Sequence, residues 1–178
     1  MSARRDRRLA YDTARSIKED LRWLSIDWDE GPFRQSDRLD IYRTRAQDLR
    51  EKGLAYRCFC STEELERARA DALRRGLPPR YRGTCRTLSK EGADDLEKKG
   101  IPHVLRFRSL EERIVFNDLV HGEMTFPEDH VDDFIIIRSD NIPSYNFAAA
   151  VDDLLMGITH VIRGADHLSN TPKQIMLG

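Results

Sequence analysis

Close to the end of the chain, ionisable side chains stand among apolar ones more densely than the packing of a core requires. The stretch of residues 142–174 reads IPSYNFAAAVDDLLMGITHVIRGADHLSNTPKQ. Within it a phenol, a guanidinium, a carboxylate and an imidazole belong to Tyr145, Arg163, Asp166 and His167. Groups of these kinds orient a small charged substrate and a nucleotide in a binding site. We therefore predict a binding site here; the alternative is that each is an ordinary core or surface residue.

A second chemically distinctive group lies earlier in the chain and contains sulfur. Cys58 and Cys60 form a Cys-x-Cys pair at the end of an expected strand, and Tyr81 and Cys85 follow later beside Gly83. Side chains alternate between the faces of a strand, so both sulfurs reach one ion only where the chain turns, as it does at a strand-to-helix junction. The layout is that of a knuckle whose ligands converge on one metal ion. Spacing alone leaves three unrelated buried thiols as an equal alternative.

Arginine is concentrated around this knuckle and offers a third candidate site. The cluster consists of Arg67, Arg69, Arg74, Arg75, Arg80, Arg82 and Arg86. A solvated helix face explains Arg67 and Arg69. Arg80, Arg82 and Arg86 flank the expected metal loop, and guanidinium groups pair well with phosphates. We predict that these three contact nucleic acid, although acidic neighbours dilute the patch.

Composition sets the limits for these interpretations. The chain has 178 residues, of which 39% are hydrophobic and 34% charged, and its net charge is −1. Nucleic-acid binding must then come from local basic patches rather than from a global field. No apolar run has the length of a membrane span and no signal peptide follows Met1, so we expect a cytoplasmic protein without a membrane partner. Three cysteines, an odd number, argue against a complete disulfide framework.

The first part of the chain is expected to be helix, loop, helix. Apolar residues recur at helical spacing over 7–24, which predicts a helix lying against a core. A loop follows, and Ser36 is the expected N-cap of a second helix ending near Gly53. A strand over 55–59 then leads into a helix with Ser61 as N-cap and Glu64 in a capping box.

The pattern changes to strands from His103 onward. The short runs HVLRFR, IVFNDLV, GEMTF and DFIIIR are rich in Val, Ile and Phe. After them we expect a helix over 145–155, a parallel core strand over 159–163, and a helix capped by Asn170 or Thr171. Ligands of parallel sheets sit at the carboxyl ends of strands, where Arg163 and the following loop would lie.

Residues 142–174 and the cysteine knuckle together resemble the bacterial glutamyl-tRNA synthetases, a family of class I aminoacyl-tRNA synthetases. The resemblance implies an α/β fold, namely a partial class I synthetase Rossmann-like nucleotide-binding fold with an inserted mixed α+β zinc-knuckle module. Residues 1–54 would be part of the first half of the Rossmann-like catalytic domain. Residues 55–138 would be the inserted module that binds the acceptor stem, and residues 139–178 would start the second half.

The resemblance also implies roles for the candidate residues. Tyr145 and Arg163 would bind L-glutamate, and Asp166 and His167 would bind ATP, which with Mg²⁺ is a substrate of the full-length enzyme. A structural Zn²⁺ would be held by Cys58, Cys60, Cys85 and Tyr81; water in the fourth position is the alternative. Arg80, Arg82 and Arg86 would contact the tRNA acceptor stem. No residue of the chain is assigned a catalytic role.

The same resemblance predicts a glutamate–tRNA ligase present as a fragment. Both ATP signature motifs of the family are missing, so we expect the chain alone to be catalytically incompetent and to self-associate through an exposed sheet edge. Ala165, Asn141 and Ser144 are mild departures from the family pattern. Two alternatives are a stand-alone zinc-stabilised module that binds the tRNA acceptor stem, and a short paralogue that transfers glutamate to a modified tRNA base. The long gap between Cys60 and Tyr81 argues against the paralogue.

Overall fold

The computed structural model describes the backbone of residues 3–178 and the side chains from Thr13 onward. The chain forms two compact units, Met1–Asp37 and Arg38–Gly178. No helix in the described part is both long enough and apolar enough to cross a membrane.

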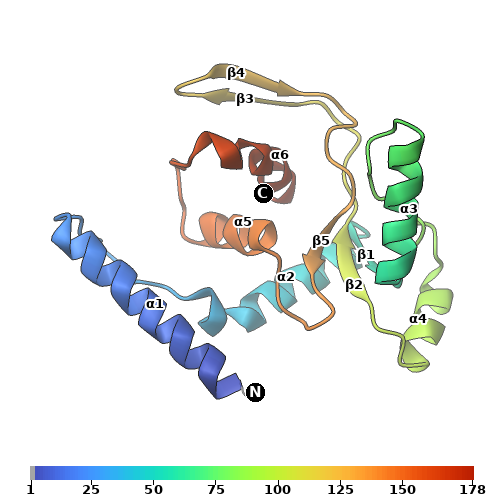
Figure 1. Cartoon of the computed structure of the whole chain (residues 1–178), viewed down its shortest axis with the longest axis horizontal. Coiled ribbons are helices and arrows are strands. Elements are labelled where there is room, and N and C mark those ends of the chain that lie inside the picture. The colour runs from blue at the N-terminus through green and yellow to red at the C-terminus, as the bar shows by residue number, and fades with distance from the viewer. Residues whose placement is uncertain (1–2) are drawn as a thin grey trace. The chain divides into compact units, whose positions relative to one another are not determined.

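The first unit consists of one long helix and an irregular segment. Helix α1 spans Ala3–Trp23, and a short 3₁₀ turn, η1, spans Gln35–Asp37 (Figure 1). The predicted helix over 7–24 is therefore confirmed. Its apolar stripe is not buried as expected, because Ile17 and Leu24 are exposed and only Leu21 is half-buried. The stripe residues Leu9 and Ala10 lie outside the described side chains.

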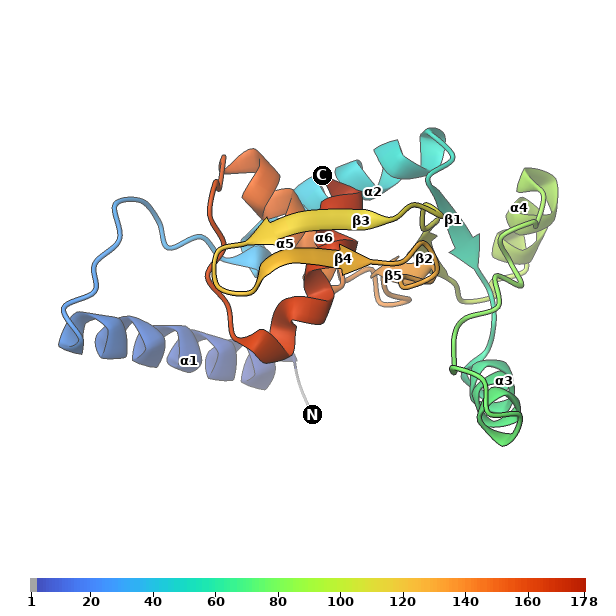
Figure 2. The same ribbon diagram turned by 90° about the horizontal axis from the view of Figure 1, so that it is seen from above.

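The second unit is built on a small antiparallel sheet. Its strands are β1 (Ala55–Cys58), β2 (Val104–Phe107) and β5 (Phe134–Ile137), in the order β1-β2-β5. Strands β3 (Ile114–Asp118) and β4 (Gly122–Phe126) pair with each other as a separate hairpin, whose two strands lie side by side in Figure 2. The strands expected between 55 and 138 are therefore confirmed.

The parallel core strand expected over 159–163 is wrong for this structure. The segment is irregular, Val161 is exposed, and the side chain of Ile162 is 100% exposed. An isolated strand is unstable without a neighbour that takes its backbone hydrogen bonds. Every strand pairing in the described residues is antiparallel, so a parallel nucleotide-binding sheet is not formed within them.

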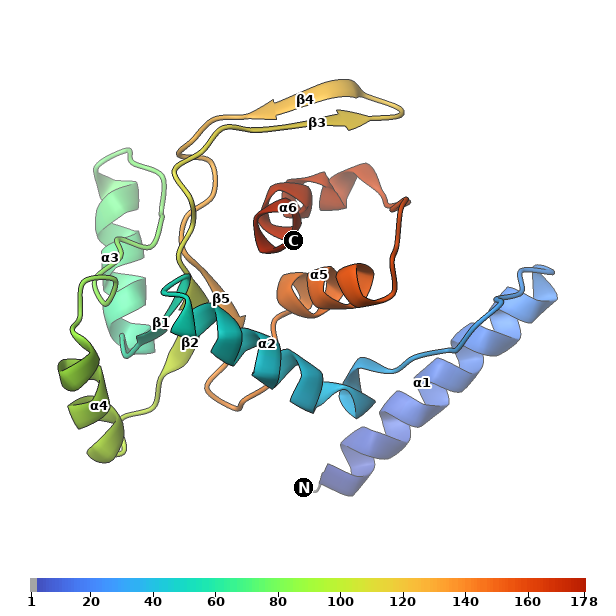
Figure 3. The ribbon, with the colours of Figure 1, turned by 180° about the vertical axis from the view of Figure 1, so that it is seen from behind.

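Helices surround the sheet of the second unit. In Figures 1 and 2, α3 and α4 lie beyond β1, on the opposite side of the sheet from α5. Helix α5 packs against α2 and α6 (Figure 3). Their bounds are α2 Leu39–Glu51, α3 Thr62–Arg74, α4 Lys90–Lys98, α5 Tyr145–Leu155, η2 Ala165–Asn170 and α6 Thr171–Leu177.

The helix termini test the predicted caps directly. Ser61 and Glu64 form the predicted capping box of α3, with Glu64 N donating to Ser61 Oγ and Ser61 N to the Glu64 carboxylate. The prediction for Ser36 is wrong, because Ser36 lies inside η1 and α2 begins after Arg38. Helix α4 was not predicted, although Ser89 caps it by accepting from Gly92 N at 3.0 Å.

The core of the second unit lies between the sheet, α2 and α5. Its largest fully buried side chains include Tyr42, Phe107, Ile136 and Phe147. Burying a side chain of this size stabilises a fold by about 1.5–3 kcal/mol. The core fixes α5 against the sheet, and with it the residues at the start of α5.

Candidate metal centre and substrate site

The sulfur cluster forms where β1 ends. Strand β1 stops at Cys58 and the chain turns into α3 after Cys60, so the two sulfurs no longer point to opposite faces. An irregular loop then returns to this turn with Tyr81 and Cys85. Gly83 lies between them at φ 72°, a left-handed conformation that glycine adopts without a steric penalty.

The four potential ligand atoms converge closely. Tyr81 Oη lies 3.2 Å from Cys58 Sγ and 3.7 Å from Cys60 Sγ, and Cys60 Sγ lies 3.6 Å from Cys85 Sγ. All three sulfurs lie within 4.8 Å of one another. Ligands about 2.3 Å from a tetrahedral zinc ion are separated by about 3.8 Å. The spacing of the three sulfurs and their soft character fit Zn²⁺, and Tyr81 Oη lies close enough to offer a fourth donor.

The protonation of these ligands opposes metal binding in acid. Burial raises the pKa of the Cys60 thiol to about 12, and burial with the hydrogen bond to Cys58 raises the pKa of Tyr81. Burial also acts on Cys58, but interactions with Tyr81 and Arg106 outweigh it and lower the pKa of this thiol. A metal ion binds the deprotonated forms, so loading releases protons.

The three arginines predicted to contact nucleic acid are already paired with acidic groups. Arg80 Nη1 lies 3.0 Å from Asp129, and Arg82 Nη2 lies 3.1 Å from Asp71. Arg86 donates to the carbonyl of Ser109 at 3.3 Å and lies 3.4 Å from the Asp133 carboxylate. All three line one cavity of about 520 Å³. A phosphate in this cavity would compete with those carboxylates.

At the other candidate site, the structure places Tyr145 and Arg163 on separate elements. Tyr145 is the first residue of α5 and is 62% exposed, while Arg163 lies in the irregular segment before η2. Arg163 Nη1 is buried and has no hydrogen-bond partner in the described part of the chain. Burial raises the pKa of Asp153, and the positive charge of Arg163 opposes that shift. The Arg163 guanidinium thus lies near the Asp153 carboxyl, and its Nη1 donor remains without an acceptor among the described residues.

Asp166 and His167 lie together in η2. His167 Nε2 is 3.5 Å from Asp166 Oδ2. A Cβ atom at Gly164 would meet Asp166 Oδ1 at 2.5 Å, so the carboxylate folds back over this glycine. No hydrogen bond joins Tyr145 to Arg163, Asp166 or His167 within the described residues. The four candidates share a region of the fold but do not form a closed constellation.

A chain of amides next to His167 was not singled out from the sequence. Gln174 Nε2 donates to Asn146 Oδ1 at 3.4 Å, and Asn146 Nδ2 donates to Asn170 Oδ1 at 3.2 Å. Asn170 Nδ2 lies 3.4 Å from His167 Nδ1. These bonds tie the start of α5 to η2 and α6. Asparagine is common at helix starts, so the sequence carried no signal that distinguished this network from ordinary capping.

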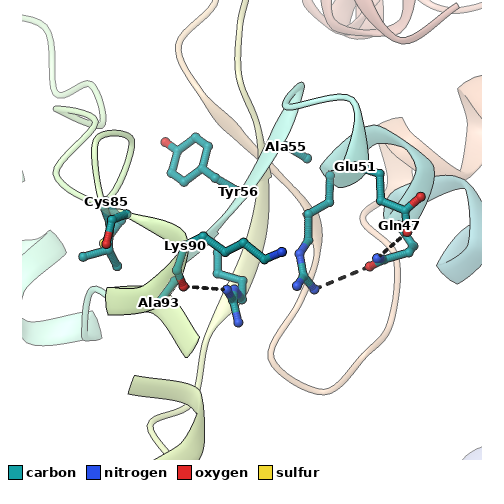
Figure 4. A pocket seen from close by; sticks show the side chains of 11 residues that line it. Gln47, Glu51, Ala55, Tyr56, Cys85, Lys90 and Ala93 are labelled. Carbon is teal, nitrogen blue, oxygen red and sulfur yellow. Dashed lines mark hydrogen bonds between the residues drawn. The ribbon is translucent and has the colours of Figure 1, made fainter. Parts of the chain in front are cut away.

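A further cavity of about 460 Å³ does not coincide with either candidate site. Figure 4 shows Gln47 and Glu51 of α2 on one side of it and Lys90 and Ala93 of α4 on the other. Gln47 donates to Glu51 at 2.8 Å and accepts from Arg50 at 3.4 Å. The polar side chains of this cavity are thus largely bonded to one another. Of the predicted site residues, only Cys85 lines the cavity.

Comparisons with known proteins identify a family. The model of the family described as tRNA synthetases class I (E and Q), catalytic domain, matches residues 5–178. The glutamate–tRNA ligase of Aquifex aeolicus is 53% identical over 160 residues, which cover 89% of this chain and 34% of that protein. The glutamate–tRNA ligase of Bacillus licheniformis is 51% identical over 166 residues, covering 88% of this chain and 34% of that protein.

The solved structures that this chain resembles are also glutamate tRNA ligases. A crystal structure of a glutamate tRNA ligase from Elizabethkingia meningosepticum, in complex with its amino acid, superposes with a TM-score of 0.81. It is 32% identical, and the match covers 90% of this chain and 35% of that one. The chain thus spans about a third of the length of the relatives that it matches.

Proposed function

Because this chain belongs to the class I tRNA synthetases for glutamate and glutamine, we propose that it forms the central part of the catalytic domain of a cytoplasmic glutamate–tRNA ligase. Such an enzyme joins L-glutamate to tRNA through a glutamyl-adenylate made from ATP and Mg²⁺. The relatives that cover most of this chain at about half identity are named glutamate–tRNA ligases, and this observation carries the proposal. Neither alternative, an isolated RNA-binding module or a tRNA-modifying paralogue, is favoured by them.

In this proposal Arg163 recognises the side-chain carboxylate of glutamate. Its buried Nη1, which lacks an acceptor among the described residues, is the structural feature that supports the role. A guanidinium pairs with a carboxylate through two parallel charge-assisted hydrogen bonds, and the neutral amide of glutamine offers neither the charge nor the second acceptor. Tyr145, exposed at the start of α5, has its phenol available for a contact with the amino acid.

Asp166 and His167 are proposed to approach ATP. They follow Gly164 directly, and the amide network of Asn146 and Asn170 holds the imidazole from its Nδ1 side. Together with Arg163, these residues would belong to the second half of a Rossmann-like domain that starts near residue 139. The first half would include residues 1–54.

Residues 55–138 are proposed to form the inserted module that binds the acceptor stem, with a structural zinc held by Cys58, Cys60, Tyr81 and Cys85. Four filled positions leave none for a substrate, so the ion would fix the loop and take no part in the chemistry. Arg80, Arg82 and Arg86 would exchange their carboxylate partners for tRNA phosphates. The pairs of Arg80 and Arg82 are exposed and contribute little stability, so exchanging them costs little, whereas Arg86 would leave the buried carboxylate of Asp133.

Glutamate-dependent exchange of pyrophosphate into ATP tests the function. It would be assayed with the 178-residue chain and with a chimaera in which these residues replace their counterpart in the Aquifex aeolicus ligase. We expect the chimaera to use glutamate and not glutamine, and the chain alone to be inactive. In the chimaera, Arg163→Lys should raise the KM for glutamate on the order of 100-fold, because lysine lacks the bidentate fork. A folded chimaera that is inactive, or that prefers glutamine, would overturn the proposal.

A further inference from the structure

Strand β2 carries a buried arginine that an amphipathic strand would place in solvent. The sequence pattern puts Val104, Arg106 and Arg108 on one face and Leu105 and Phe107 on the other, which predicts a half-buried strand. Instead the side of β2 that carries Arg106 is covered, and Arg106 is 7% exposed. Burying a cation is unfavourable unless nearby groups compensate its charge.

The known contacts of Arg106 do not provide that compensation. Its Nη1 donates to the main-chain carbonyl of Asp133 at 3.0 Å, and its Cζ lies 3.9 Å from the centroid of the Tyr81 ring. Its Nε is buried and has no hydrogen-bond partner within the described residues. A neutral carbonyl and an aromatic face do not neutralise a full positive charge. Among the described residues no carboxylate forms an ion pair with Arg106, and the acidic group whose pKa it lowers is the Cys58 thiol.

The sheet register shows which anion is in reach. Arg106 pairs with Tyr56, and Cys58 pairs with Val104, so Cys58 and Arg106 are diagonal neighbours on the same face of β1 and β2. Long side chains span the diagonal separation on one sheet face. The register of β2 against β5 shifts between Leu105 and Arg106, an irregularity of the kind that redirects side chains. The guanidinium thus lies over Tyr81 and beside Cys58, two of the four proposed metal ligands.

We propose that Arg106 is a positioning residue of the zinc centre: it stacks on the ring of ligand Tyr81, donates its free Nε–H to the Cys58 sulfur, and supplies the countercharge of the loaded site. The inference rests on the zinc centre proposed above. Three thiolates and a phenolate around Zn²⁺ carry a net charge of −2, and a buried cation beside them offsets one unit. Hydrogen bonds to a ligand from the surrounding residues orient that ligand and strengthen metal binding.

Arg57 offers a matched control on the same sheet. It is 5% exposed, and it pairs with Leu105 in the register, one position from Arg106. Its guanidinium forms ion pairs with Asp94 and Glu97 of α4 instead of facing the sulfurs. Replacing Arg57 therefore removes a buried arginine from the same sheet without removing a partner of the metal ligands.

The experiment measures zinc affinity by competition with a chromophoric chelator, on the 178-residue chain and its variants Arg106→Met, Arg106→Lys and Arg57→Met. We expect Arg106→Met to weaken zinc binding on the order of 10- to 100-fold. The zinc affinity of Arg106→Lys should lie between those of Arg106→Met and the unchanged chain, because lysine keeps the charge and loses the planar stacking group. Arg57→Met should bind zinc within about twofold of the unchanged chain, because the bonds of the ligands stay intact.

Cobalt substitution supplies a readout that does not depend on overall stability. The absorption bands of thiolate-bound Co²⁺ report the ligand geometry, so Arg106→Met should shift them and Arg57→Met should not. Zinc affinity and a cobalt spectrum unchanged in Arg106→Met would overturn the role of Arg106, as would an equal loss of affinity in Arg57→Met. An unchanged chain that takes up neither metal would overturn the zinc centre itself, and the role of Arg106 with it.

Discussion

At the cysteine cluster, Tyr81 offers a hydroxyl oxygen near the sulfurs and an aromatic ring against Arg106. One substitution distinguishes the contributions of these two groups. Tyr81→Phe removes the oxygen that lies 3.2 Å from Cys58 Sγ and keeps the ring against which Arg106 packs. We expect zinc affinity to fall roughly tenfold, because a water replaces the phenolate as fourth ligand. Chelator competition measures this change. Unchanged affinity would mean that water occupies the fourth position in the parent chain as well.

At Gly164, the addition of a single Cβ atom tests the position of the Asp166 carboxylate. Its φ is −65°, so alanine fits the backbone, but a Cβ atom would lie 2.5 Å from Asp166 Oδ1. Gly164→Ala must therefore move the carboxylate and leave the fold in place. In the Aquifex chimaera we expect the KM for ATP to rise several-fold while the KM for glutamate stays the same. A KM for ATP equal to that of the parent chimaera would separate Asp166 from the nucleotide.

Between elements, a partly buried polar triad joins α2 to α5. Tyr42, 0% exposed, donates to both carboxylate oxygens of Asp152 at 2.7 and 2.9 Å, and Arg38 Nε donates to Asp152 Oδ1 at 2.9 Å. Arg38 and Asp152 are 114 positions apart in the chain, so no local sequence pattern indicates their contact. The triad thus helps to hold the helix that begins with Tyr145 against the core.

The triad predicts a pH dependence in alkali. Burial, followed by the bond to Asp152, raises the pKa of Tyr42 to about 12, above the ordinary value of 10.0. The folded state therefore holds the phenolic proton more tightly than the unfolded state, so its contribution to stability is complete below pH 10 and is lost between pH 10 and 12. Tyr42→Phe should lower the free energy of unfolding at pH 7 by about 1–3 kcal/mol and flatten this alkaline loss. Urea titrations at pH 7 and above pH 10 measure both effects; a variant as sensitive to alkali as its parent would contradict the assignment.

Elements that depend on local sequence patterns were predicted, and elements that depend on partners distant in the chain were not. The capping box of Ser61 and Glu64 and the strands over 55–138 follow from residues within a few positions of one another. The strand expected over 159–163 depends on a neighbouring strand, which the described residues do not supply. Helix α4 was not predicted, although Ser89 caps it and its two apolar residues, Ala93 and Leu96, lie at helical spacing.

At the scale of the whole molecule, the second unit keeps its two candidate sites on opposite sides of the three-stranded sheet. The metal centre lies by α3, and the proposed amino-acid site lies by α5 and η2 (Figure 1). Apolar side chains remain exposed around the second site, namely Leu154, Leu155, Ile158, Val161 and Ile162. Exposed large apolar side chains concentrated in one segment are typical of a site that another polypeptide covers.

This surface predicts self-association of the 178-residue chain. Ile162→Glu places a charge on its fully exposed residue, so we expect a lower sedimentation coefficient at micromolar concentration than for the parent chain. Leu119→Glu is the matched control, because Leu119 is 86% exposed at the tip of the β3–β4 hairpin and belongs to a different surface. A parent chain that sediments as a monomer, or an equal effect of Leu119→Glu, would contradict the prediction.

From the amino-acid sequence alone follow the family resemblance, the types of most elements, and the membership of the cysteine cluster. These depend on spacing within short segments and on side-chain chemistry that a turn at Cys60 brings together. Only the tertiary structure decides which groups are paired. It places Arg106 beside Tyr81 of the cysteine cluster, gives Arg80, Arg82 and Arg86 carboxylate partners, and leaves Arg163 Nη1 without a hydrogen-bond partner among the described residues. The physical reason is that burial and pairing depend on residues distant in the chain, whose approach no local pattern encodes.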